Sequence, residues 1–139
     1  MPLGLLAAAV TLYAAACSSS QTVTVTDGWS RPVPPVSPAS AVFLEISNDL
    51  DGSVTLTGAS SEACRSMELH QTTIDDAGVM TMRPLADGLL LEPGTSARLA
   101  PGGTHLMCLE PEVLEGSFDV ELVLDGAAAI VTTVTIEDR

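Results

Sequence analysis

The sequence predicts an all-β domain, built as a sandwich or barrel of short strands. Runs of β-branched and apolar residues recur along residues 23–139, and Asp-Gly or Pro-Gly pairs that favour turns separate them. Short strands punctuated at roughly 8–12-residue intervals are typical of sandwiches and barrels. No stretch from Thr22 to Arg139 shows convincing helical periodicity with caps. The 139 residues suit one domain, and no repeat or linker divides them.

Ten runs are the expected strands. The first alternates Thr and Val, the second is apolar and precedes Asn48, and the third follows an Asp51-Gly52 turn. Residues 32–38 hold four prolines and are expected to form an extended loop. Further turns are expected at Asp27-Gly28, Asp87-Gly88 and Asp125-Gly126. The expected strands are residues 22–26, 41–46, 54–57, 67–70, 79–83, 89–91, 97–99, 105–109, 118–124 and 129–136.

Residues 1–16 are expected to be a signal peptide outside the fold. Their apolar run has about 14 residues, which is shorter than the roughly 20 of a membrane span and suits a signal peptide. The sequence Ala14-Ala15-Ala16-Cys17 resembles a bacterial lipobox, so Cys17 is the expected lipidation site and residues 17–22 a tether. This predicts a lipoprotein in the periplasm or at the outer face of the cytoplasmic membrane. A plain secretory signal or a simple N-terminal anchor is the alternative.

The charge balance excludes two classes of partner. Five basic residues, all Arg, face eighteen acidic ones, for a formal net charge of −13. Nucleic acid and anionic lipid both need a cationic face, so we expect neither as a partner and membrane attachment only through the N-terminal lipid. No hydrolase motif appears in the sequence, and we expect a protein that is not an enzyme.

Two cysteines are the candidates for a disulfide. If lipid consumes Cys17, then Cys64 and Cys108 remain as an even pair in an oxidising compartment. Their disulfide would close a loop of about 43 residues and contribute on the order of 4 kcal/mol in the chain-entropy model. The alternative is two buried free thiols.

Soft metal donors cluster in one part of the chain. Apart from Met1, every Met and both His lie between positions 67 and 107. The pairs Met80/Met82 and His105/Met107 are spaced i, i+2, which places both members of each pair on one face of a strand. With His70 expected at the end of a third strand, these donors are predicted to meet at one rim of the sandwich.

That donor set favours copper(I) over other metals. A thioether is neutral and soft, a poor ligand for Zn²⁺, Ca²⁺ or Mg²⁺ and a good one for Cu(I). Thioethers neither titrate nor form disulfides, so they keep binding in an oxidising compartment. Ordinary core packing is the competing interpretation for each Met. It is preferred for Met67, which alternates with Leu69. Met80 is interpreted either as a core residue or as a residue that packs behind the metal ligands. For Met82, His105 and Met107, the residues alone leave the two interpretations open.

The sequence resembles a known family at these positions, the periplasmic copper chaperones called PCuAC. The resemblance rests on three segments: residues 68–70 (Glu-Leu-His), 80–84 (Met-Thr-Met-Arg-Pro) and 101–107 (Pro-Gly-Gly-Thr-His-Leu-Met). It implies a cupredoxin-like Greek-key fold and copper ligands at His70, Met82, His105 and Met107, with Met80 as an additional candidate. Cys108 follows Met107 directly, so on a regular strand it faces the other way and is interpreted as structural.

The resemblance also implies a function. It predicts a Cu(I) carrier that delivers copper to the binuclear copper centre of cytochrome c oxidase, together with a Sco-type thiol protein. Two other classes remain open. An electron-transfer cupredoxin needs a Cys thiolate with two His and an axial Met. A secreted interaction module would use its Met and His only for packing.

Overall fold

The computed structural model describes residues 21–112 and 115–139. The expected signal peptide and Cys17 lie outside the described residues. The described chain forms ten β-strands. They are β1 (Val23–Ser30), β2 (Ala39–Asn48), β3 (Val54–Ser60), β4 (Cys64–Ile74), β5 (Met80–Pro84), β6 (Leu89–Leu91), β7 (Thr95–Leu99), β8 (Thr104–Pro111), β9 (Ser117–Asp125) and β10 (Ile130–Ile136). Within this part of the chain, no helix is long and apolar enough to cross a membrane.

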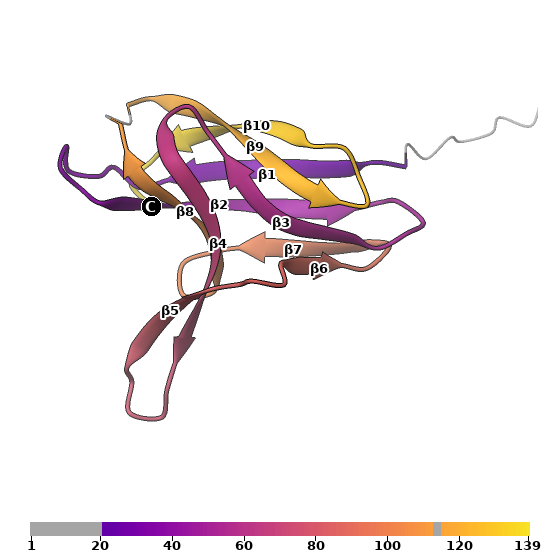
Figure 1. Ribbon diagram of the computed structural model, residues 1–139, viewed down its shortest axis with the longest axis horizontal. Helices are drawn as coiled ribbons and strands as arrows, with labels where there is room; N and C mark the ends of the chain where they lie inside the picture. Colours follow the sequence, from indigo (N-terminus) through magenta and orange to yellow (C-terminus); the bar gives the residue numbers. More distant parts are fainter. Residues whose placement is uncertain (1–20, 113–114) are drawn as a thin grey trace, which may run out of the picture.

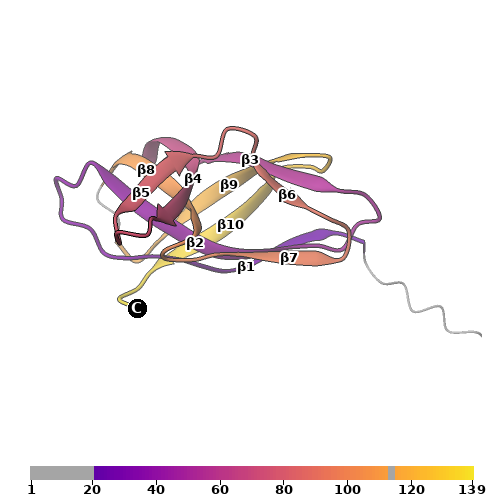
Figure 2. The same cartoon turned by 90° about the horizontal axis from the view of Figure 1, so that it is seen from below.

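The strands make one sheet that folds over on itself. Its order is β5-β4-β8-β2-β1-β10-β9-β3-β6, with β7 paired to β2. All pairings are antiparallel except that of β1 with β10. Figure 2 shows β1, β2 and β7 on one side of the molecule, with β3 and β6 on the other. The predicted all-β class is therefore confirmed.

The core lies inside this folded sheet. Alternate residues of the strands face inward, because successive side chains of a strand point to opposite faces. Leu106 of β8 is fully buried and sits opposite Leu69 of β4 and Val42 of β2. Besides Cys108 of β8, the other fully buried apolar side chains come from β2, β3, β6, β7, β9 and β10; the largest are Leu44, Ile46, Leu56, Leu91, Leu99, Leu122, Val54, Val120 and Val134.

Two predictions about strand ends were wrong. The Asp27-Gly28 pair is not a turn between elements, because β1 continues through it as a bulge with the register shift between Thr26 and Trp29. Asp27 takes the left-handed conformation there (φ 53°), which Asp tolerates better than most residues. His70 does not end its strand, because β4 runs on to Ile74.

The extended part of β4 pairs with β5 and forms a projecting hairpin. Figure 1 shows this hairpin extending away from the rest of the molecule. Among the described strands β5 is the edge of the sheet, and β4 is the strand it pairs with. Four of the exposed large apolar side chains belong to this hairpin: Ile74, Val79, Met80 and Met82.

Candidate metal centre

The pairing of β4 with β8 brings three of the predicted ligands to one face. His70 lies directly opposite His105, and Met107 lies opposite Glu68. Directly opposed residues of an antiparallel pair share a face, as do residues i and i+2 of one strand. The two imidazoles and the Met107 thioether therefore all lie on the face turned away from Leu69 and the core.

The β4–β5 hairpin adds two more thioethers to that face. Met82 is opposite Thr72, and Met80 is opposite Ile74. Since Thr72 follows His70 at i+2, Met82 and Met80 share the face of the two histidines. Their exposed fractions are 51% for Met82 and 57% for Met80. Of the two alternatives for Met80, a place in the core is wrong, because the hairpin projects beyond the packed sheet. A place behind the metal ligands stays a prediction.

In the described part of the chain, each histidine ring has one nitrogen in a hydrogen bond and one nitrogen without a hydrogen-bond partner. The Nδ1 of His105 donates to the carbonyl oxygen of Gly103 at 3.1 Å. The Nε2 of His70 donates to the Glu68 carboxylate at 2.7 Å. Because a carbonyl and a carboxylate only accept, the protons are assigned to those two nitrogens. The remaining nitrogens, Nδ1 of His70 and Nε2 of His105, are buried and have no hydrogen-bond partner among the residues that the structure describes.

Two unpartnered buried acceptors on neighbouring rings require an explanation. The centroids of the two rings are 6.0 Å apart. Leaving a buried acceptor unsatisfied costs about 1–3 kcal/mol, so native structures rarely keep two together without a use for them. A neutral imidazole nitrogen whose partner nitrogen is hydrogen-bonded is the usual form of a histidine metal ligand. The residues present therefore fit a metal ion.

An aromatic wall lies behind His105. The ring of Phe43 lies 6.3 Å from that of His105, and Trp29 lies 4.7 Å from Phe43. The guanidinium of Arg139 covers Trp29 at 4.9 Å and donates two hydrogen bonds to Asp27. These bonds hold the pKa of the Asp27 carboxyl below its ordinary value. His105 itself is 2% exposed, with Phe43 beside its ring and its Nδ1 hydrogen-bonded to Gly103.

The predicted metal donors on this face are two imidazoles and three thioethers. Among residues 21–112 and 115–139, no group of three or more His, Cys, Asp or Glu side chains is placed to hold a metal ion. Hard or borderline ions such as Ca²⁺ and Zn²⁺ prefer such groups. Two imidazoles with Met thioethers instead match a soft monovalent ion.

The expected disulfide is present and lies away from this face. Cys64 and Cys108 are bonded to each other. Cys108 is fully buried on the core side of β8, as its position directly after Met107 predicts. Neither of these two cysteines is therefore free to act as the thiolate that an electron-transfer cupredoxin site requires.

Sequence reasoning missed three parts of the site. Glu68, the Gly103 carbonyl and the Trp29–Phe43 wall were not predicted to contribute. Glu68 could have been found from its i−2 position to His70, which places both side chains on one face of a strand. The Trp29–Phe43 wall depends on cross-strand register, which a single sequence does not reveal. The Gly103 carbonyl lies only two residues before His105, and its contact depends on the conformation of the turn that precedes β8.

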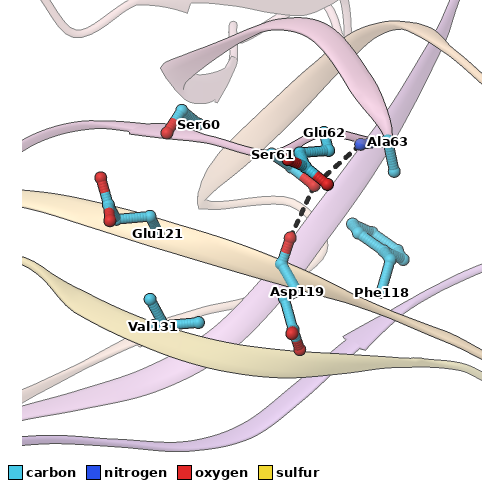
Figure 3. Close-up of a pocket in the computed structure, with 8 residues that line it drawn as sticks. All are labelled: Ser60, Ser61, Glu62, Ala63, Phe118, Asp119, Glu121 and Val131. Atoms are coloured by element: carbon cyan, nitrogen blue, oxygen red, sulfur yellow. Dashed lines mark hydrogen bonds between the residues drawn. The ribbon is translucent and has the colours of Figure 1, made fainter.

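A surface hollow elsewhere has a different character. Figure 3 shows this hollow, of about 680 Å³, between residues 60–63 and strands β9 and β10. It contains carboxylates such as Asp119 and apolar groups such as Phe118, but no His or Met. Ser61 donates to the carbonyl oxygen of Asp119 and accepts from the Ala63 amide, so these groups already have partners. The hollow therefore offers no soft metal ligand.

Comparisons with known proteins agree with this fold. A family model described as "Putative lipoprotein LpqE-like" matches residues 23–136. "Putative lipoprotein Lxx21020" of Leifsonia xyli subsp. xyli (strain CTCB07) is 35% identical over 69 residues, which is 50% of this chain and 41% of that protein. The match thus spans about two fifths of that relative's length.

Two solved structures have the same fold. The copper-bound PCuAC domain from PmoF2 superposes with a TM-score of 0.69 at 19% identity, covering 84% of this chain and 93% of that one. The solution structure of CuI-DR1885 from Deinococcus radiodurans gives 0.56 at 24% identity, covering 84% and 77%. The cupredoxin-like fold implied by the sequence resemblance is confirmed.

Proposed function

We propose that this chain, which belongs to the LpqE-like family, is a carrier of Cu(I) outside the cytoplasm. The observation that supports this most is a pair of buried imidazole nitrogens that have no hydrogen-bond partner in the described part of the chain. Their rings lie on the same face as the thioethers. The proposed ligands are His70, Met82, His105 and Met107. Copper is the cargo of this protein, and its transfer is ligand exchange without a change of oxidation state.

The burial of the donors suits uptake and release. His105 is buried and held against Phe43, so it forms the fixed floor of the site. Met82 is half-exposed on the edge strand β5, where another protein can reach it. Because a single thioether bond is weak, a recipient's ligand can replace Met82 first and leave the other donors in place during the exchange.

The similar proteins support copper as the cargo. The PmoF2 domain is described as copper-bound, and the DR1885 structure as its CuI form. Both share the fold of this chain, and the four proposed ligands are present here at the positions that the PCuAC resemblance implies. Copper(I) is therefore the ion we assign to the site.

We propose an anchored location and a recipient on the same grounds. The family and the Leifsonia relative are described as lipoproteins, which supports lipid attachment at Cys17 and a position at the outer face of the cytoplasmic membrane. The PCuAC resemblance supports delivery to the binuclear copper centre of cytochrome c oxidase, with a Sco-type thiol protein taking part.

Competition with a Cu(I) chelator under anaerobic conditions tests the ligand assignment. Loss of a residue that only orients a ligand costs about 10–100-fold in metal affinity, so Met82→Ala and His105→Ala are each expected to cost at least about tenfold. Met67→Ala is the matched control, because Met67 lies opposite Cys108 on the core side of β4 and should leave affinity unchanged. Equal affinity in all three variants would overturn the assignment. Absence of Cu(I) binding by the wild type would favour an interaction module instead.

A further inference from the structure

Glu68 makes a contact that the proposed ligand set leaves unexplained. Its carboxylate accepts a 2.7 Å hydrogen bond from the Nε2 of His70, although 48% of the Glu68 side chain is exposed. An exposed carboxylate normally remains in water, because holding a long side chain in one conformation costs entropy. Here the Glu68 carboxylate is instead hydrogen-bonded to the imidazole of His70.

This contact determines which nitrogen His70 offers to the metal. A carboxylate can only accept, so the proton of His70 stays on Nε2 and the lone pair stays on the buried Nδ1. The carboxylate also makes the free nitrogen a stronger donor, since it balances the positive charge that the ring gains on coordination. Orientation and basicity of the His70 ligand atom therefore both depend on Glu68.

We propose that Glu68 is a positioning residue that holds the His70 ring with Nδ1 facing the copper site. The inference rests on the proposed function, because it assigns Glu68 a role in metal binding through His70. Glu68 is not assigned as a ligand, since no group of three His, Cys, Asp or Glu side chains among the described residues is placed to hold a metal.

The two histidines differ in how they are held. His105 is oriented by the carbonyl oxygen of Gly103, which also accepts from the Thr72 amide at 3.1 Å and is thereby fixed between two strands. Among the described residues, the hydrogen-bond partner of the His70 ring is a side chain, the carboxylate of Glu68. A single substitution at Glu68 should thus release His70 and leave His105 in place, which makes His105 an internal control.

Two measurements on Glu68→Ala and Glu68→Gln test the proposal. The first is the ¹H–¹⁵N spectrum of the imidazoles in the metal-free protein, at a pH where imidazole is neutral. We expect His70 in the wild type to be protonated only at Nε2, and in Glu68→Ala to show a mixture of the two neutral forms. Glu68→Gln should keep the wild-type pattern, because its amide oxygen still accepts the hydrogen bond. His105 should be protonated at Nδ1 in every variant.

The second measurement is Cu(I) affinity. We expect Glu68→Ala to bind about 10–100-fold more weakly than the wild type, and Glu68→Gln to lose less. Asp76→Asn is the charge control, because it removes one negative charge from an exposed position of the same hairpin and should change affinity less than twofold, as expected for a screened surface charge. Thermal unfolding of each variant confirms that the fold is retained.

The results separate this inference from the proposed function. If Glu68→Ala has the His70 spectrum and the affinity of the wild type, or binds no more weakly than Asp76→Asn, the positioning role is wrong while copper binding stands. If the wild type binds no Cu(I), the proposed function fails, and the metal-free spectra alone decide whether Glu68 fixes His70.

Discussion

Removal of the Cys64–Cys108 disulfide should strongly destabilise the fold. The bond joins residues 44 positions apart and lies on the core side of the β4–β8 pair. In the chain-entropy model, opening a loop of that length lowers the free energy of the unfolded chain by about 4 kcal/mol near room temperature, because the chain gains conformational entropy. A domain of this size is typically stable by only about 5–15 kcal/mol, so the loss is a large fraction of the total.

Urea unfolding of the Cys64→Ala/Cys108→Ala double variant measures this loss. With a slope on the order of 2 kcal/mol per molar urea, the midpoint should fall by about 2 M. Wild-type protein with the disulfide reduced is the matched control, because it lacks the cross-link but keeps both sulfur atoms in the core. The two samples should therefore unfold at similar urea concentrations.

Two outcomes would contradict the chain-entropy explanation of this disulfide. A loss below about 1 kcal/mol in both samples would show that the cross-link does not restrict the unfolded chain as the loop length requires. A large loss in the double variant alone would assign the effect to core packing. In either case, the entropic account of this disulfide would be refuted.

Three further changes probe other parts of the structure. Leu106→Ala should cost about 2–5 kcal/mol in urea unfolding, because Leu106 is fully buried, and a loss under about 1 kcal/mol would contradict its place in the core. Met67→Ala, at a half-buried position, should cost about 1–2 kcal/mol and leave Cu(I) affinity unchanged; weaker Cu(I) binding would place Met67 in the site. Asp27→Asn should be less stable than the wild type at neutral pH, because its Arg139 partner holds the pKa of Asp27 below 3.8. The difference in stability between the wild type and Asp27→Asn should be largest above pH 3.8, the ordinary pKa of Asp, and should shrink as the pH falls through the lower pKa of the folded state. Thermal unfolding that shows the same difference at every pH would contradict this expectation.

The sequence was sufficient to predict the strands but not the residue at which each strand ends. Each of the ten expected runs lies within or overlaps a strand, because apolar alternation and turn pairs are local signals. Asp27-Gly28 has the same local signal as the true turns. It becomes a bulge because Trp29, just beyond it, is buried and pairs with Phe43. That pairing is a tertiary contact, and no window of the sequence contains it.

The candidate site was predictable to a similar degree. The i, i+2 spacings place the predicted donors on shared strand faces, and the register brings those faces together. Sequence reasoning could not foresee that His70 lies four residues inside β4, or that Met80 is exposed on a projecting hairpin. It also could not foresee the Glu68 contact, which depends on the conformation of a flexible side chain.

X-ray absorption of the Cu(I)-loaded protein tests the coordination on which the proposed function depends. We expect sulfur and imidazole nitrogen around copper in the wild type, one sulfur fewer in Met82→Ala and in Met107→Ala, and no change in Met67→Ala. A copper environment without sulfur, or one that is the same in the wild type and in the Met82 and Met107 variants, would contradict it.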